Sequence, residues 1–235
     1  MSYVLWLFEF GYILQHAETI FQIFRIRKKK STEIISLETN IMFLIGALSR
    51  LAWMWDSMLK GFFLAYIEIV LAIVSLVYII YLYRKYKGNT LVTEEIRLPT
   101  LMRVEVLLPL VCILSYFFHP GSKRGYGLNF QMFVSLSIYS EAIGLIPQWY
   151  MITREKDTGN ISQFYVVFLA FARLFRLLFW IKMYYDGMKF GNLIIADLIH
   201  CAVLFNFVYN VIKNWNKGFL PQFGESDKPW IKKIF

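Results

Sequence analysis

The stretch SIYSEAIGLIPQ, residues 137–148, puts a carboxylate, Glu141, and the pair Pro147-Gln148 inside a long apolar run. Burying an ionisable side chain at membrane depth is costly unless the group is paired or faces water. Helical periodicity places Glu141, Gly144 and Gln148 on one face of such a segment. Glu141 is therefore expected to have partners on other helices and to mark a functional site.

Composition extends this interpretation to the whole chain. Of the 235 residues, 58% are hydrophobic and 19% are aromatic, whereas an ordinary soluble domain is about 45–50% apolar. Seven apolar runs each approach the ~20 residues that a membrane-spanning helix requires. They cover residues 4–25, 37–58, 61–83, 99–118, 129–152, 163–185 and 192–213. The sequence thus predicts an all-α membrane protein with seven transmembrane helices in residues 1–213 and a tail at 214–235.

The distribution of basic residues predicts a membrane topology and argues against nucleic-acid binding. The net charge is +9, but lysines and arginines cluster after runs one, three, five and seven instead of forming a stripe with interleaved aromatics. The positive-inside rule then places the C-terminal tail in the cytosol and Met1 on the lumenal or outer side. No basic residue precedes the first run, so this run is expected to stay as a helix and not to be a cleavable signal peptide.

The chain also contains a weak internal repeat. A shift of 126 residues, without gaps, superimposes Arg50 on Arg176 and places Gln15 on Glu141. Runs one and two thereby map onto runs five and six, a pattern typical of membrane proteins built from two copies of one bundle. We therefore expect two parallel three-helix bundles linked by helix four.

Three arginines and one acid are predicted near the middle of the membrane, namely Arg50, Arg173, Arg176 and Glu141. Three cations facing one carboxylate leave an excess of positive charge, and guanidinium groups bind carboxylate or phosphate in a bidentate way. The pattern predicts a polar cavity for an anionic ligand; the alternative is that Glu141 only ties helices together. Trp180 shares a helix face with Arg173 and Arg176 and is expected to stack on the ligand or to join the interfacial aromatic belt.

Other polar residues at membrane depth are less specific. His16 is a candidate for a pH switch because histidine titrates near neutral pH; a hydrogen-bonded structural histidine is the alternative. Glu9, Glu18 and Glu68 are expected to line the same cavity or to face neighbouring helices. No H-x-x-x-H set, catalytic Ser/His/Asp spacing or glycine-rich phosphate loop occurs in the sequence, so we expect no enzyme activity, no cofactor and no metal site.

These residues resemble the KDEL receptors, which retrieve escaped proteins to the endoplasmic reticulum, and more distantly the PQ-loop and SWEET transporters of the same fold. The resemblance rests on Ser49-Arg50-Leu51, on residues 137–148, and on Arg173 with Trp180. It implies a lumen-facing cavity that binds the C-terminal tetrapeptide of a soluble cargo protein. It also implies that Arg50 binds the peptide, while Glu141, Arg173 and Trp180 belong to the network around it.

One departure from the family pattern concerns pH. The family binds at mildly acidic pH through a histidine in the first helix, and that position falls on Gln15 in this chain, with His16 one residue away. One residue turns a side chain by about 100° around a helix. His16 is therefore the candidate for the same task from a different direction.

The other departures concern the peptide-binding arginines. The family's first-helix arginine has no counterpart, since no lysine or arginine precedes Arg25. The family's arginine three residues beyond the tryptophan falls on Met183, and its aspartate three residues beyond Arg50 falls on Trp53. Arg176 is an extra cation relative to the pattern. A ligand other than a KDEL-type tetrapeptide is therefore an alternative.

The C-terminus, Lys232-Lys233-Ile234-Phe235, resembles the dilysine signal by which the COPI coatomer returns membrane proteins from Golgi to endoplasmic reticulum. The first hypothesis is thus a cargo-sorting receptor of endoplasmic reticulum and Golgi membranes that binds the retrieval signal of soluble proteins. The second is a PQ-loop-like transporter of a small anion or amino acid, with Glu141 as a proton-coupling group.

Overall fold

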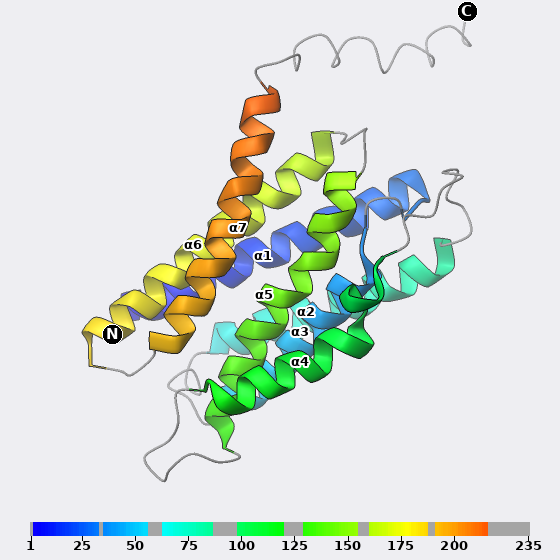
Figure 1. Ribbon diagram of the computed structural model, residues 1–235. Helices are drawn as coiled ribbons and strands as arrows, with labels where there is room; N and C mark the ends of the chain where they lie inside the picture. Colours follow the sequence, from blue (N-terminus) through cyan, green and yellow to red (C-terminus); the bar gives the residue numbers. More distant parts are fainter. Residues whose placement is uncertain are drawn as a thin grey trace, which may run out of the picture.

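The computed structural model describes residues 2–32, 35–55, 63–86, 98–119, 129–154, 160–187 and 191–215. The described residues form seven α-helices and no strand (Figure 1). The helices are α1 (Ser2–Lys29), α2 (Leu37–Met54), α3 (Phe63–Tyr86), α4 (Val104–Phe117), α5 (Phe130–Arg154), α6 (Asn160–Tyr185) and α7 (Gly191–Trp215). Each predicted run therefore forms a helix, which confirms the all-α prediction.

Helix α4 begins later than the predicted run 99–118. A 3-10 turn at Thr100–Met102 precedes it, and Arg103 is extended, with φ −83° and ψ 151°. The carboxylate of Glu38 accepts a hydrogen bond from the backbone N–H of Val104 at 3.0 Å, which caps the new start. At 1.5 Å per residue, its 14 residues span only ~21 Å, so α4 is the shortest of the described helices.

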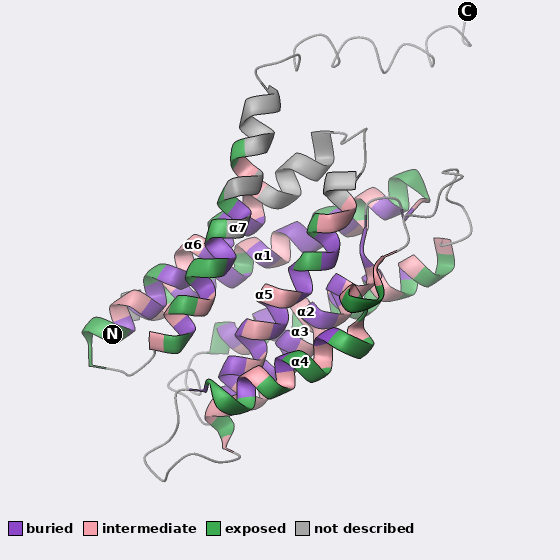
Figure 2. Ribbon diagram, in the orientation of Figure 1, coloured by how far each residue is buried: buried purple, intermediate pink, exposed green. Residues whose placement is uncertain are grey.

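The distribution of burial is the reverse of that in a soluble protein (Figure 2). Large apolar side chains such as Phe63 and Val74 are 76% and 59% exposed, whereas Arg173 and Asp197 are fully buried. Charged groups are almost never fully buried in water-soluble domains unless they are paired. Among the described residues, α3 and residues 130–151 of α5 stand out as spans by hydropathy, whereas α1, α6 and α7 carry buried charged side chains. The chain is a seven-helix membrane protein whose polar groups face inward.

The helices are arranged as two bundles of three. Helix α3 packs on α1 and α2, α7 packs on α5 and α6, and α4 lies mainly along α5. Across the boundary, α1 packs against α6 and α2 packs against α5 (Figure 1). The sequence repeat maps α1 onto α5 and α2 onto α6, so it exchanges these two cross-boundary contacts. The predicted pair of three-helix bundles linked by helix four is confirmed.

Two glycines let the bundles approach closely at related places. A Cβ atom on Gly11 would lie 2.8 Å from the carbonyl oxygen of Ala172, and one on Gly46 would lie 3.2 Å from that of Ser137. The shift of 126 carries Gly11 to Ser137 and Gly46 to Ala172, so the two contacts are equivalent. Small residues allow such backbone contact between helices in a membrane.

The Pro147-Gln148 pair fastens α5 to the start of α2. The side-chain oxygen of Gln148 accepts a hydrogen bond from the backbone N–H of Ser36 at 2.7 Å, and its own backbone N–H donates to Thr39 Oγ1 at 3.1 Å. One turn earlier, a Cβ atom on Gly144 would lie 2.4 Å from the Cβ of Met42. Gly144 and Gln148, which share a face of α5 with Glu141, therefore pack against α2.

Candidate functional site

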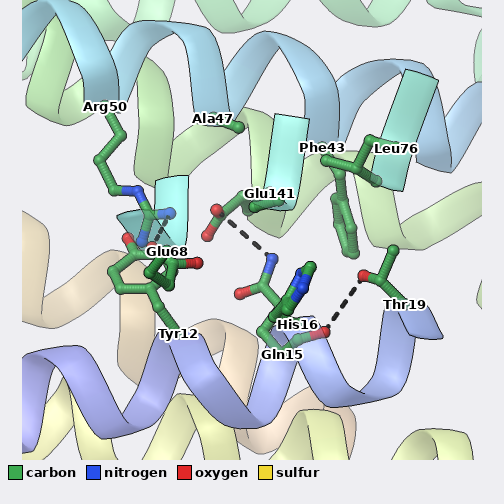
Figure 3. A pocket seen from close by; sticks show the side chains of 11 residues that line it. Tyr12, Gln15, His16, Thr19, Phe43, Ala47, Arg50, Glu68, Leu76 and Glu141 are labelled. Atoms are coloured by element: carbon green, nitrogen blue, oxygen red, sulfur yellow. Dashed lines mark hydrogen bonds and ion pairs between the residues drawn. The ribbon is translucent and has the colours of Figure 1, made fainter. Parts of the chain in front are cut away.

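Arg50 of α2 is held at the inner face of the first bundle (Figure 3). Its side chain is 3% exposed, and Nη2 lies 2.5 Å from Oε2 of Glu68 on α3. The guanidinium carbon lies 3.4 Å from the ring centroid of Tyr12 on α1, a cation–π contact. Among the described residues, Nε and Nη1 of Arg50 have no hydrogen-bond partner. Arg50 is thus neutralised but retains unused donors.

Two arginines of α6 form the corresponding arrangement in the second bundle. Arg176 Nη1 lies 2.5 Å from Oε2 of Glu141 on α5, and its Nη2 lies 3.9 Å from Oδ1 of Asp197 on α7. Arg173 lies 3.0 Å from the same Glu141 oxygen and 3.7 Å from Asp197 Oδ1. All four side chains are at most 2% exposed. Two buried acids therefore balance two buried arginines.

Tyr12 and Gln15 of α1 join the two halves. The Tyr12 ring lies between two guanidinium groups, since the Arg176 carbon is 4.6 Å from the ring centroid on which Arg50 also packs. Gln15 donates a hydrogen bond to Glu141 at 3.5 Å and accepts one from Arg176 at 3.3 Å. Gln15 and Glu141 are 126 residues apart, so repeat-related positions meet at the boundary between the bundles.

The prediction of an excess of positive charge is wrong. Three buried arginines face three buried carboxylates, because Glu68 pairs with Arg50 and Asp197 lies beside the α6 arginines. Sequence spacing leaves the direction of Glu68 open, and Asp197 is not among the predicted site residues. The repeat contains a signal for both: a shift of 126 carries Glu68 to position 194, one helical turn from Asp197.

A narrow cavity opens beside Arg50, between α1, α2, α3 and α5. It has about 300 Å³ of empty space when its opening is included, and its enclosed part has room for about one or two water molecules. Arg50, Glu68, Gln15, His16 and Glu141 contribute its polar surface. The same wall includes Thr19 and apolar side chains, Phe43 and Leu76 among them. The candidate switch residue His16 thus lines the cavity beside Gln15, and its role in pH sensing stays a prediction.

Trp180 does not lie in the interfacial aromatic belt, and its stacking on a ligand stays a prediction. It is 2% exposed, which rules out the interfacial aromatic belt, and its ring packs edge-on against Phe179 at 4.8 Å between centroids. Phe8 of α1 lies 6.3 Å from Trp180 and 6.2 Å from Trp53 of α2. Together with Met183 these side chains form what we call the aromatic layer: Phe8, Trp53, Phe179, Trp180 and Met183.

Lys232 and Lys233, and with them the dilysine signal, lie outside the described residues. Within the described part of the chain, no three His, Cys, Asp or Glu side chains are grouped as a metal site would require.

Comparison with known proteins identifies the family. The model of a family described as ER lumen protein retaining receptor matches residues 31–183, well over half of the chain. The chain belongs to this receptor family. The matched segment contains Arg50, Glu141, Arg173, Arg176 and Trp180. The family is one of retention receptors and not of enzymes.

Three relatives of this receptor-family member are similar over most of their length. ER lumen protein-retaining receptor 3 of Mus musculus is 24% identical over 194 residues, which are 80% of this chain and 86% of the mouse protein. ER lumen protein-retaining receptor of Kluyveromyces lactis is 25% identical over 216 residues, 88% and 94% of the two chains. ER lumen protein-retaining receptor 2 of Homo sapiens is 25% identical over 206 residues, which are 86% of this chain and 91% of the human protein. The chain is a divergent member of its family.

Proposed function

We propose that this receptor-family member binds the C-terminal retrieval signal of soluble endoplasmic-reticulum proteins and returns them from the Golgi. In this proposal the N-terminus faces the lumen, the tail faces the cytosol, and the cargo peptide reaches Arg50 from the lumenal side. Arg50 binds the terminal carboxylate of the cargo. Glu141, Arg173 and Arg176 form the charged network behind it.

The observation that carries this proposal is the incomplete pairing of Arg50. A guanidinium group has five N–H donors in a planar fork, and it binds carboxylates through two parallel hydrogen bonds. In the described structure only Nη2 has an acceptor, from Glu68, while Nε and Nη1 remain unpaired at the edge of the cavity. A peptide carboxylate would use these donors. Because the enclosed cavity is about the size of one or two water molecules, binding requires the side chains around Arg50 to move apart.

Charge balance predicts that binding takes up a proton. The network already has as many carboxylates as arginines, and Glu9, fully buried close to Arg50 and Glu68, adds another acid. A ligand carboxylate would bring a further negative charge into a site where unpaired charge is costly. Protonation of Glu68, Glu9 or His16 would offset it, so affinity should rise as pH falls. The charged or titratable groups around the cavity are Glu9, Tyr12, His16, Arg50, Glu68, Glu141 and Arg176.

Sorting would depend on the tail. Lys232 and Lys233 have the spacing of a dilysine signal for COPI coatomer, and an extended cytosolic tail would present them to the coat. Cargo binding and coat binding would thus take place on opposite sides of the membrane. The receptor would cycle between Golgi and endoplasmic reticulum membranes.

The test is equilibrium binding of short retrieval peptides to the purified full-length protein at about pH 5.5 and about pH 7.2, a range in which histidine titrates. Each peptide is compared with its C-terminal amide, which lacks the carboxylate. Saturable binding that is lost on amidation and is tighter at the lower pH is expected. Arg27→Gln, an exposed arginine at the end of α1, is the matched control and should bind normally. Absence of carboxylate-dependent binding at both pH values refutes the proposal.

A transporter is the second candidate, favoured by one observation. Two parallel bundles that meet at buried charged residues are an arrangement in which secondary transporters place their substrate site. Counterflow of a small anion or amino acid in proteoliposomes, abolished by Glu141→Gln, would support transport. Peptide binding without any such flux would support the receptor.

A further inference from the structure

The aromatic layer lies one helical turn from the arginines, toward the end of the bundle where α1 begins and α2 and α6 end. Phe8 precedes Tyr12 by four residues, Trp53 follows Arg50 by three, and Trp180 follows Arg176 by four. At 1.5 Å per residue, these offsets are about 4.5 to 6 Å along the helix axes. With the N-terminus in the lumen, the layer lies between the lumen and Arg50.

The layer is closed and apolar. Phe8 packs on Phe179 at 4.8 Å between ring centroids and on Tyr12 at 4.8 Å. Each of the five side chains in the layer is at most 6% exposed. Among the described residues, the indole N–H of Trp53 has no hydrogen-bond partner, although it is buried. The layer thus offers large apolar surfaces and one unused donor.

A carboxylate bound to Arg50 would place the preceding part of its peptide in this layer. An extended chain advances about 3.3 Å per residue, so the layer corresponds to the one or two residues before the terminal one. Met183 lies seven residues beyond Arg176, about 10 Å along the helix. It would therefore contact the next peptide residue toward the N-terminus.

We propose that this receptor selects C-terminal peptides whose residues just before the terminal one are apolar, and that the aromatic layer excludes acidic side chains there. The inference rests on the proposed function, since it takes the ligand to be a C-terminal peptide held by Arg50. An acidic side chain entering the layer loses its hydration and finds no cation within it. An apolar side chain packs on the rings, and a peptide carbonyl accepts the hydrogen bond from Trp53.

The experiment uses the full-length chain without substitution. Short peptides with a free C-terminal carboxylate carry Leu and Phe, Ser and Gln, or Asp and Glu at the positions before the terminal residue. Each has an amidated counterpart, and affinities are measured by calorimetry in detergent. The apolar series is expected to bind about 10- to 100-fold more tightly than the acidic series, and amidation should abolish binding of both.

The outcomes separate the two proposals. If the acidic series binds as tightly as the apolar series or more tightly, the selectivity proposal is overturned and the receptor function stands. Apolar peptides that bind equally well as amides also overturn it, because such binding does not involve Arg50. If no series shows carboxylate-dependent binding, the proposed function fails and the selectivity proposal fails with it.

Two variants locate the selectivity. Met183→Arg introduces a cation into the layer and should shift the preference toward acidic peptides by about tenfold or more. Trp53→Phe keeps an aromatic ring but removes the indole donor, so the affinity of all peptides should fall by about three- to tenfold with little change in preference. An unchanged preference in folded Met183→Arg protein refutes the assignment to this layer.

Discussion

Removing Arg50 and Glu68 separately and together tests the ligand-binding proposal without confusing binding with folding. Arg50→Gln alone leaves the Glu68 carboxylate buried and unpaired, which typically destabilises a protein by about 3–5 kcal/mol. The double variant Arg50→Gln with Glu68→Gln removes both members of the ion pair, which lie 2.5 Å apart, so neither is left as an unpaired charge. We expect it to fold with a stability close to that of the unaltered chain.

The effect on binding follows from the donors of Arg50. Hydrogen bonds to a charged group contribute about 1.5–3 kcal/mol each, and Nε and Nη1 provide at least two of them. Losing about 3 kcal/mol corresponds to a fall in affinity of at least about 100-fold. Glu68→Gln alone removes the competing carboxylate and should raise peptide affinity at neutral pH by about tenfold, since about 1.4 kcal/mol corresponds to that factor.

The assay is calorimetric titration with the tightest-binding peptide at neutral pH, together with thermal unfolding of each variant in the same detergent. Arg27→Gln, exposed at the end of α1, controls for the loss of an arginine elsewhere. If the folded double variant binds within about threefold of the unaltered chain, Arg50 does not hold the ligand and the cavity assignment is wrong.

Four further outcomes are expected. His16→Ala should flatten the rise of peptide affinity with falling pH; an unchanged slope of log Kd against pH would assign the proton to a carboxyl group instead. Gln148→Ala removes the acceptor at the start of α2 and should lower stability by about 1–3 kcal/mol in thermal unfolding, with affinity retained. Gly46→Ala brings a Cβ atom to 2.7 Å from a serine hydroxyl oxygen on α5 and should cost about 1–3 kcal/mol by overpacking; an unchanged melting temperature would contradict the close approach. Replacing Lys232 and Lys233 by serine should move the receptor toward the Golgi, seen by fluorescence microscopy, without changing peptide affinity.

The helices and their grouping were predictable because the membrane imposes a length and a composition on every span. A helix of about 20 apolar residues leaves a long continuous signal, and the repeat fixes which helices correspond. Helix α4 is the exception, because its start is set by the cap from Glu38, a contact between distant residues. Sequence spacing along one helix carries no information on such a contact.

The pairing of charges was only partly predictable. Periodicity located Arg173 and Arg176 on one face of α6, but their partner Asp197 lies on another helix in an apolar run with no motif around it. The aromatic layer was not predictable for a similar reason. In the sequence, Phe8 and Trp53 cannot be distinguished from aromatic residues that face lipid. Only the packing of three helices shows that they are buried together.

Tyr12 is one of the positions at which the two halves of the molecule differ. Its counterpart under the repeat is Ile138, so a single phenol ring serves both guanidinium groups and lies 1.2 Å nearer to one, with centroid distances of 3.4 and 4.6 Å. With identical residues in both halves, a guest would bind in two poses of equal energy that differ by a half turn about the axis relating the parallel bundles. Tyr12 in one half and Ile138 in the other contribute to making these poses unequal, so an asymmetric guest has one preferred orientation.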